Sequence, residues 1–204
     1  MIAVVDVCGG NLRSVSRALA RAGGDVVVTR DAEVVRRADK VVVPGQGAFD
    51  VFMHALGDGR GLGDALRDAI ARGVPYLGIC LGMQVLFEHG AEGDCAGLGV
   101  LRGRVDKLPA GGAVKVPHVG WSSVEQATGP RPRTSAILGA IDDGAYFYFT
   151  HSYRAVPADR DDIALEAEHG VRFCAAIARD HIFACQFHPE KSQAAGLRLL
   201  AAFV

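Results

Sequence analysis

The sequence has no excess of charge of either sign and no apolar run long enough to cross a membrane. Its 22 basic and 23 acidic residues leave a formal net charge of −1, so electrostatics does not favour binding to nucleic acid or to an anionic membrane. The apolar segment 194–204 is shorter than a bilayer span and contains Arg198. Residues 1–10 lack a basic segment before their apolar run, which Asp6 interrupts, and do not resemble a signal peptide.

The sequence also lacks the patterns of metal and dinucleotide sites. Its five cysteines include no Cys-x-x-Cys pair, which argues against a zinc site and against a disulfide framework. The histidines lack the spacing of metal ligands, and the glycine-rich segment 57–63 neither reads Gly-x-Gly-x-x-Gly nor follows a predicted strand. We expect no metal and no cofactor, and the odd number of cysteines predicts a reducing, cytoplasmic location.

What is present is the composition of a globular protein. Of the 204 residues, 50% are hydrophobic and 22% are charged, and a chain of this length can bury a sizeable core. No internal repeat and no low-complexity linker divides it. We therefore expect a single domain over residues 1–204.

Buried strands and helices alternate over residues 1–90. Apolar residues at helical spacing occupy residues 12–22 and 61–73, and we predict a further helix over 80–89. Four continuous apolar runs are typical of strands covered on both faces; they lie at residues 2–7, 25–29, 39–45 and 74–79. This order predicts an α/β fold with a mostly parallel central sheet and helices on both faces.

From residue 97 the pattern changes to shorter β-rich segments. A final helix is predicted over residues 192–203, and residues 109–112 and 129–133 are candidate exposed loops. The β-rich segments resemble antiparallel hairpins and predict an antiparallel β extension of the parallel core; they lie at residues 99–105, 118–124, 145–154, 162–169, 174–179 and 181–187.

The first chemical motif, Gly78-Ile79-Cys80-Leu81-Gly82, directly follows the fourth predicted strand. It has the form Gly-x-nucleophile-x-Gly, in which the glycines allow a tight turn from strand to helix. Such a turn presents the central side chain at the carboxyl edge of the sheet. Cys80 is therefore a candidate nucleophile, and the alternative is a structural cysteine between packing glycines.

The second motif, Gln186-Phe187-His188-Pro189-Glu190, follows the last predicted strand. A nucleophilic cysteine needs a base that takes its proton and later protonates the leaving group, and the base needs an acceptor on its other ring nitrogen. Residues two apart in an extended segment point to the same side, so His188 and Glu190 can form this pair. The alternative is a histidine at a strand end, followed by a proline and a glutamate that start a helix.

The third motif is Pro44-Gly45-Gln46-Gly47, after the third predicted strand. Its glycines let a backbone N–H turn toward a developing oxyanion, and the Leu81 N–H beside Cys80 is a candidate second donor. A plain turn is the alternative.

In this order, the three motifs resemble the class I (triad) glutamine amidotransferases over most of the chain. Within that family, the opening residues 10–15 and four further blocks resemble the glutaminase subunits of imidazole glycerol phosphate synthases; the blocks are residues 78–84, 116–121, 148–153 and 186–192. Two positions depart from the pattern. The opening usually reads Asp-Tyr-Gly-x-Gly-Asn, where this chain has Asp6-Val7-Cys8-Gly9-Gly10-Asn11, and Gln46 is a common but not universal occupant of its loop position.

The resemblance implies hydrolysis of L-glutamine to glutamate and ammonia through a cysteinyl thioester on Cys80. It implies that His188 moves the proton and that Glu190 holds His188. It also implies that the N–H groups of Leu81 and Gln46 stabilise the oxyanion, and that the glutamine pocket is lined by Gly47, Gln84 and Ser152.

The resemblance further implies a heterodimer with a cyclase subunit that is a (β/α)8 barrel. This partner receives the ammonia through an internal channel and makes imidazole glycerol phosphate and AICAR in histidine biosynthesis. The positions that match those facing the cyclase are Asn11, Trp121, Tyr148 and Lys191. The alternative is that Trp121 and Tyr148 are core aromatics and that Lys191 is a solvated lysine at a helix start.

Three other functions stay open. They are another glutaminase subunit, of the anthranilate or p-aminobenzoate type, a non-catalytic regulatory module, and a cysteine peptidase. The intact Cys80, His188 and Glu190 argue against a non-catalytic module. A peptidase leaves the blocks at 116–121 and 186–192 without an explanation.

Overall fold

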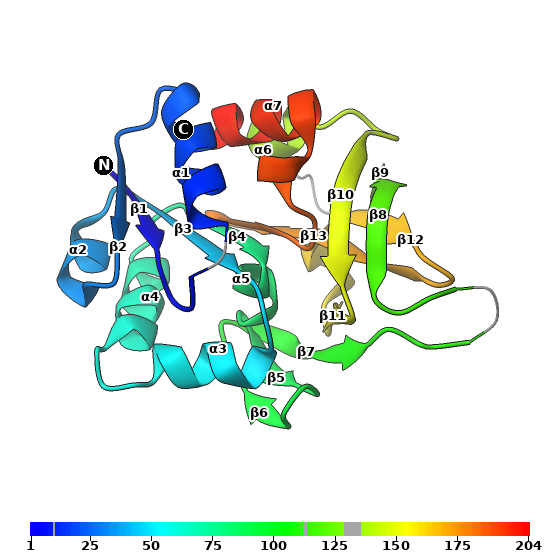
Figure 1. The fold of residues 1–204 in the computed structure, drawn as a ribbon, viewed down its shortest axis with the longest axis horizontal. Helices are drawn as coiled ribbons and strands as arrows, with labels where there is room; N and C mark the ends of the chain where they lie inside the picture. The colour runs from blue at the N-terminus through cyan, green and yellow to red at the C-terminus, as the bar shows by residue number, and fades with distance from the viewer. Residues whose placement is uncertain (10, 112–113, 129–135) are drawn as a thin grey trace.

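In a computed structural model, which describes residues 1–9, 11–111, 114–128 and 136–204, the chain folds around an eight-stranded sheet (Figure 1). Strands β2, β1, β3, β4 and β14 are parallel, and β13, β12 and β9 continue the sheet in antiparallel pairing. This arrangement confirms the predicted fold class. The order is β2 (Val26–Thr29), β1 (Ile2–Val5), β3 (Lys40–Gly45), β4 (Tyr76–Cys80), β14 (Ile182–Cys185), β13 (Arg172–Arg179), β12 (Ile163–Glu168) and β9 (Glu125–Gln126).

The parallel strands form where the sequence is continuously apolar. Every residue of β1, β4 and β14 is buried, because helices cover both faces of this part of the sheet. Strand β14 corrects one expectation, since its segment was assigned only to the antiparallel extension. It pairs antiparallel with β13 but parallel with β4, and its apolar character on both faces suits this position inside the sheet.

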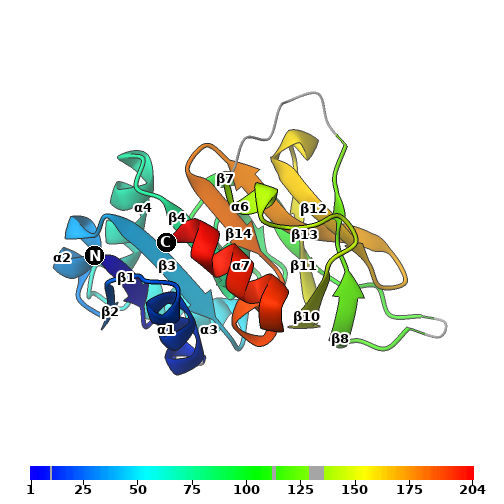
Figure 2. The same ribbon diagram turned by 90° about the horizontal axis from the view of Figure 1, so that it is seen from above.

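Helices lie on the two faces of the sheet (Figures 1 and 2). Buried side chains of α1 (Leu12–Arg21), α6 (Ala136–Gly139) and α7 (Gln193–Phe203) share one hydrophobic core, and those of α2 (Ala32–Arg37), α3 (Phe49–Leu56), α4 (Leu62–Ala71) and α5 (Leu81–Gln84) share the other. Two short 3-10 helices, η1 (Arg160–Asp162) and η2 (Pro189–Lys191), complete the helical elements of the described residues.

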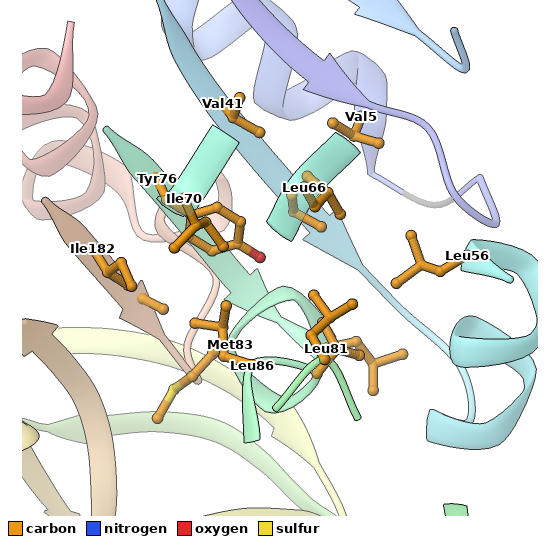
Figure 3. Close-up of a cluster of buried hydrophobic side chains, with 14 of the residues drawn as sticks. Val5, Val41, Leu56, Leu66, Ile70, Tyr76, Leu81, Met83, Leu86 and Ile182 are labelled. Atoms are coloured by element: carbon orange, nitrogen blue, oxygen red, sulfur yellow. The ribbon is translucent and has the colours of Figure 1, made fainter. Parts of the chain in front are cut away.

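The core shared by α2, α3, α4 and α5 packs against the turn between β4 and α5. Leu66 and Ile70 of α4 pack with Tyr76, Leu81 and Met83 in one buried cluster (Figure 3). The hydroxyl of Tyr76 donates a hydrogen bond to the Gly82 carbonyl oxygen at 2.7 Å. The buried phenol of Tyr76 on β4 therefore fixes the backbone of α5 to the sheet.

Two smaller sheets accompany the central sheet. One pairs β8 (His118–Ser123) antiparallel with β10 (Tyr146–His151). The other has the order β11 (Tyr153–Pro157), β7 (Leu101–Lys107), β5 (Phe87–Gly90) and β6 (Cys95–Ala96). In Figure 1, β8 and β10 stand on the side away from β2, and β5 and β6 lie at the bottom of the view.

The predicted helix over residues 80–89 is wrong beyond Gln84. Val85, Leu86 and Phe87 are consecutive and fully buried, whereas a helix on a sheet usually buries only one face. The chain instead leaves the helix and pairs through β5 with β7 and β6. Helices α2 and α3 are absent from the sequence-based prediction.

The two candidate loops are only partly covered by the described residues. Residues 109–111 are exposed as predicted. Residue 112 and the segment 129–133 lie outside the described residues.

Among the helices of the described chain, none is long and apolar enough to span a membrane.

Candidate active site

Cys80 lies on a strained turn at the carboxyl end of β4. Its backbone has φ 55° and ψ −106°, a positive φ that residues with a side chain rarely adopt. A Cβ on Gly78 would lie 2.4 Å from the Gly82 oxygen, and a Cβ on Gly82 would lie 1.8 Å from the Val43 oxygen. Both glycines of the motif are therefore required by close backbone contact, and α5 begins immediately after the cysteine.

His188 and Glu190 form a buried pair after β14. His188 Nδ1 lies 2.8 Å from Glu190 Oε1, and the two side chains are 2% and 0% exposed. Because a carboxylate only accepts hydrogen bonds, Nδ1 carries the proton and Nε2 is the ring atom left for chemistry. The Asn11 amide donates to the same Glu190 oxygen at 2.9 Å. The His188 N–H donates to the Tyr148 carbonyl oxygen at 2.9 Å, which ties the pair to β10.

The electrostatics of this pair favour an ionised state. Burial alone would lower the pKa of His188, but interactions with Cys80 and Glu190 outweigh it and raise that pKa to about 9. Burial acts to raise the pKa of Glu190, but the hydrogen bond and charge of His188, together with the Asn11 amide, lower it. His188 Nε2 is buried and makes no hydrogen bond of normal geometry to any described residue. This nitrogen is therefore available to exchange a proton with Cys80 or a bound substrate.

A cavity of about 400 Å³ is lined by Cys80 and His188. It brings together all the residues that the sequence predicts for the oxyanion and glutamine sites, and Lys191 lies at it as well; those residues are Gln46, Gly47, Leu81, Gln84 and Ser152. Gly47 has φ 105°, and an added Cβ would meet nothing within 4 Å. Glycine suits this position because of its backbone conformation and not because of crowding.

Other residues of the site were not predicted as site residues, although all but Glu92 lie in the blocks 116–121 and 148–153. Thr150, His151, Tyr153, Pro117 and Glu92 also line the cavity. The carboxylate of Glu92 accepts a hydrogen bond from the Phe49 N–H at 2.9 Å. No motif marks this glutamate, which reaches the cavity only because the chain turns back after β5.

Gln186 was also missed, although it lies within the second motif. Its side chain is fully buried, and its Nε2 lies 3.5 Å from Cys80 Sγ. Gln186 precedes His188 by two residues in an extended segment. The alternation that pairs His188 with Glu190 was therefore also a signal for Gln186.

The predicted interface residues fall in two settings. Trp121 of β8 is 45% exposed and lies edge to face with Tyr148 of β10, at 6.1 Å between ring centroids. Lys191 Nζ lies 5.7 Å from the Tyr148 ring centroid. These three form one cluster on the surface, so Trp121 is not a core aromatic. Asn11 instead donates to Glu190, the residue before Lys191.

Comparison with known proteins shows the family of the chain. Residues 3–204 match the family described as Glutamine amidotransferase class-I. The chain belongs to the class-I glutamine amidotransferases. A protein named imidazole glycerol phosphate synthase subunit HisH, from Nitrosospira multiformis, is 47% identical over 212 residues, which cover 100% of this chain and 96% of that protein. The protein of the same name from Thiobacillus denitrificans is 49% identical, with coverage of 100% and 90%.

Solved structures share the class-I glutamine amidotransferase fold at lower identity. A structure described as glutamine amidotransferase has a TM-score of 0.74 at 20% identity and covers 100% of both chains. The structure of PurLQS from Thermotoga maritima has a TM-score of 0.74 at 18% identity, and covers 99% of this chain and 96% of that one. These likenesses bear on the fold alone.

Among the described residues, no group of three or more His, Cys, Asp or Glu side chains could hold a metal ion.

Proposed function

We propose that the chain hydrolyses the side-chain amide of L-glutamine to glutamate and ammonia, as the glutaminase subunit of an imidazole glycerol phosphate synthase. The observation that carries this proposal is the buried His188–Glu190 pair at the same cavity as the strained Cys80. Similarity along the whole chain to subunits of that synthase favours it over a glutaminase of the anthranilate or p-aminobenzoate type.

In the proposed reaction, His188 Nε2 already holds the proton of Cys80, and Cys80 Sγ attacks the amide carbon of glutamine as the thiolate. His188 then gives this proton to the amide nitrogen as the C–N bond breaks, and ammonia leaves. Water attacks the resulting thioester, with His188 taking the proton of the water and returning it to the sulfur as glutamate departs. Glu190 takes no part in bond making and holds the imidazole ring through Nδ1.

The negative oxygen of each tetrahedral intermediate needs donors that are already in place. The main-chain N–H groups of Leu81 and Gln46 are the proposed donors, since both residues line the cavity that holds Cys80. The residues proposed to bind the rest of the glutamine molecule are Gly47, Gln84 and Ser152.

The proposed partner is the cyclase subunit of the same synthase, a (β/α)8 barrel that uses the ammonia to form imidazole glycerol phosphate and AICAR. The cluster of exposed Trp121 with half-buried Tyr148 and Lys191 supports a partner surface on this side, because it adjoins the cavity through Lys191. Asn11 is proposed to link this surface to the triad through its bond to Glu190. We further propose that residues 1–204 form a single domain that works in the cytoplasm, in keeping with five free thiols.

Replacement of the nucleophile tests this function. In Cys80→Ala, glutamine-dependent synthesis by the complex with the cyclase should fall by at least roughly 10³-fold, because alanine cannot form the thioester intermediate. Synthesis from added ammonium salt should persist, since ammonia reaches the cyclase independently of Cys80. Hydrolysis of glutamine by Cys80→Ala at the rate of the unaltered chain would refute the assignment. Incubation with an anthranilate or p-aminobenzoate synthase subunit in place of the cyclase tests the competing glutaminase types.

A further inference from the structure

Gln186 lies between the nucleophile and a series of buried polar groups. Its side chain is 0% exposed, and its backbone N–H is held by the Ala175 oxygen at 2.8 Å. One end of the side-chain amide lies 2.8 Å from the Gln84 amide, and the other lies 3.5 Å from Cys80 Sγ. The chemistry at the sulfur depends on which end of the amide carries the oxygen.

The neighbouring groups determine this orientation. The Tyr153 carbonyl oxygen can only accept, and the Gln84 amide group within 3.0 Å of it must therefore be the Nε2 donor. The same nitrogen faces Gln186 at 2.8 Å. That end of Gln186 must be the oxygen, because two NH₂ groups in contact would repel. The Gln186 NH₂ group is therefore directed at Cys80 Sγ.

Two buried histidines support this arrangement from the other side of Tyr153. His151 Nδ1 lies 2.8 Å from the Tyr153 oxygen, so this ring nitrogen carries a proton and Nε2 accepts. His118 Nδ1 lies 3.2 Å from that Nε2 and is its donor, while His118 Nε2 accepts from the Ser122 hydroxyl at 3.0 Å. The Tyr153 carbonyl oxygen thus accepts from both His151 Nδ1 and Gln84 Nε2. A reversed Gln84 amide would set its oxygen against this carbonyl oxygen, and two acceptors in contact repel.

We propose that Gln186 is a positioning residue that donates a hydrogen bond to the sulfur of Cys80 and stabilises it as the thiolate. The inference rests on the proposed role of Cys80 as the nucleophile. A donor at a fixed place holds the sulfur in one rotamer and offsets the loss of water around a buried negative charge. His188 transfers the proton, whereas Gln186 stabilises the negative charge on the sulfur.

The pH dependence of Cys80 alkylation by iodoacetamide tests this role. Methionine has a similar length to glutamine but no donor. In Gln186→Met, the midpoint, which is the pH at which the alkylation rate of Cys80 reaches half of its plateau, should therefore rise by about one unit. The plateau rate at high pH should stay within about twofold, because access to the sulfur is unchanged. The titratable groups around the sulfur and the cavity are His188 with its partner Glu190, the neighbouring Cys185, and the lining residues His151, Tyr153, Glu92 and Lys191.

Cys185→Ala is the matched control. Cys185 is the buried neighbour of Gln186, and its thiol contacts the Phe187 oxygen at 3.4 Å. Its loss should lower thermal stability without moving the midpoint for Cys80, identified by mass spectrometry of the labelled peptide. If Gln186→Met does not fold, Gln186→Leu supplies the test, because it also lacks a donor and adds no charge beside the sulfur, and it should raise the midpoint by about one unit.

A midpoint equal to that of the unaltered chain in the folded variant overturns the proposal. A purely structural role predicts this result, with a lower melting temperature alone. Failure of the proposed function looks different, because glutamine hydrolysis would then survive in Cys80→Ala whatever the alkylation profile of the Gln186 variants.

Discussion

The two sides of the active-site cavity differ in what holds them in place. On the side of the parallel strands, backbone lies against backbone, because Gly82 and Gly78 leave no room for a Cβ beside the backbone oxygens of Val43 and Gly82. On the side of β10 and β11, side chains carry the structure, through the bonds of His151 and Gln84 to the Tyr153 oxygen. Added side-chain volume should destabilise the first side. Protonation of the buried histidines should destabilise the second.

The largest effect on stability is expected for Gly82→Ala, which places a methyl group 1.8 Å from the Val43 oxygen. Neither β3 nor α5 can yield without moving Cys80, so we expect a loss of roughly 3 kcal/mol or more in the free energy of unfolding. Urea denaturation measures it. Gly139→Ala is the control, since a Cβ there meets nothing within 4 Å, and it should change stability by less than about 0.5 kcal/mol. Equal stability of the two variants would contradict a volume-limited turn.

Within the triad, the expected effects are on catalysis and not on stability. His188→Ala should reduce glutamine hydrolysis about as much as Cys80→Ala, and the double variant should be little worse than either, because the two residues act as a unit. Glu190→Gln should retain measurable turnover, since an orienting group takes no part in bond making. Steady-state assays with the cyclase present measure all four proteins. Equal loss in Glu190→Gln and His188→Ala would mean that Glu190 does more than orient the ring.

The smallest effect concerns the pH dependence of stability. Burial and the nearby His169 lower the pKa of His118 to about 4. Burial lowers the pKa of His151 to about 3, despite its bond to the Tyr153 oxygen. Below pH 6.5 the unfolded chain binds more protons at these positions than the folded chain. The free energy of unfolding should therefore fall as the pH falls from about 6.5 to 4.

His118→Phe removes one of these protonation sites and keeps a ring to stack on Phe149. Its free energy of unfolding should depend less on pH in this window, by up to about 1.4 kcal/mol per pH unit. Denaturation curves at several pH values measure the slope, and parallel curves for the two proteins would contradict the prediction. His188 should act in the opposite direction. Its raised pKa gives stability that is fully present below pH 6.5 and is lost as the pH rises through about 9.

The same difference explains what the sequence could predict. The Gly-x-Cys-x-Gly turn and the buried strands are local patterns, so the position of Cys80 follows from neighbours in the chain. Glu92 and the contacts of Gln84 with Gln186 depend on residues far apart in sequence. The end of α5 at Gln84 depends on pairing of β5 with β7, and no local pattern contains that pairing. Asp31, whose carboxylate accepts from the Glu33 N–H at the start of α2, was a local signal that the prediction overlooked.

The ribbon of β8 and β10 has consequences for handling the protein. Its inner face carries Phe147 and Phe149, while its outer face carries Val119, Trp121 and Tyr146, which are 59%, 45% and 62% exposed. A strand pair that is apolar on both faces leaves one of them in contact with water when the chain is alone. Purified without a partner, the chain should therefore self-associate as its concentration rises, and co-expression with the cyclase is the rational route to a monodisperse sample.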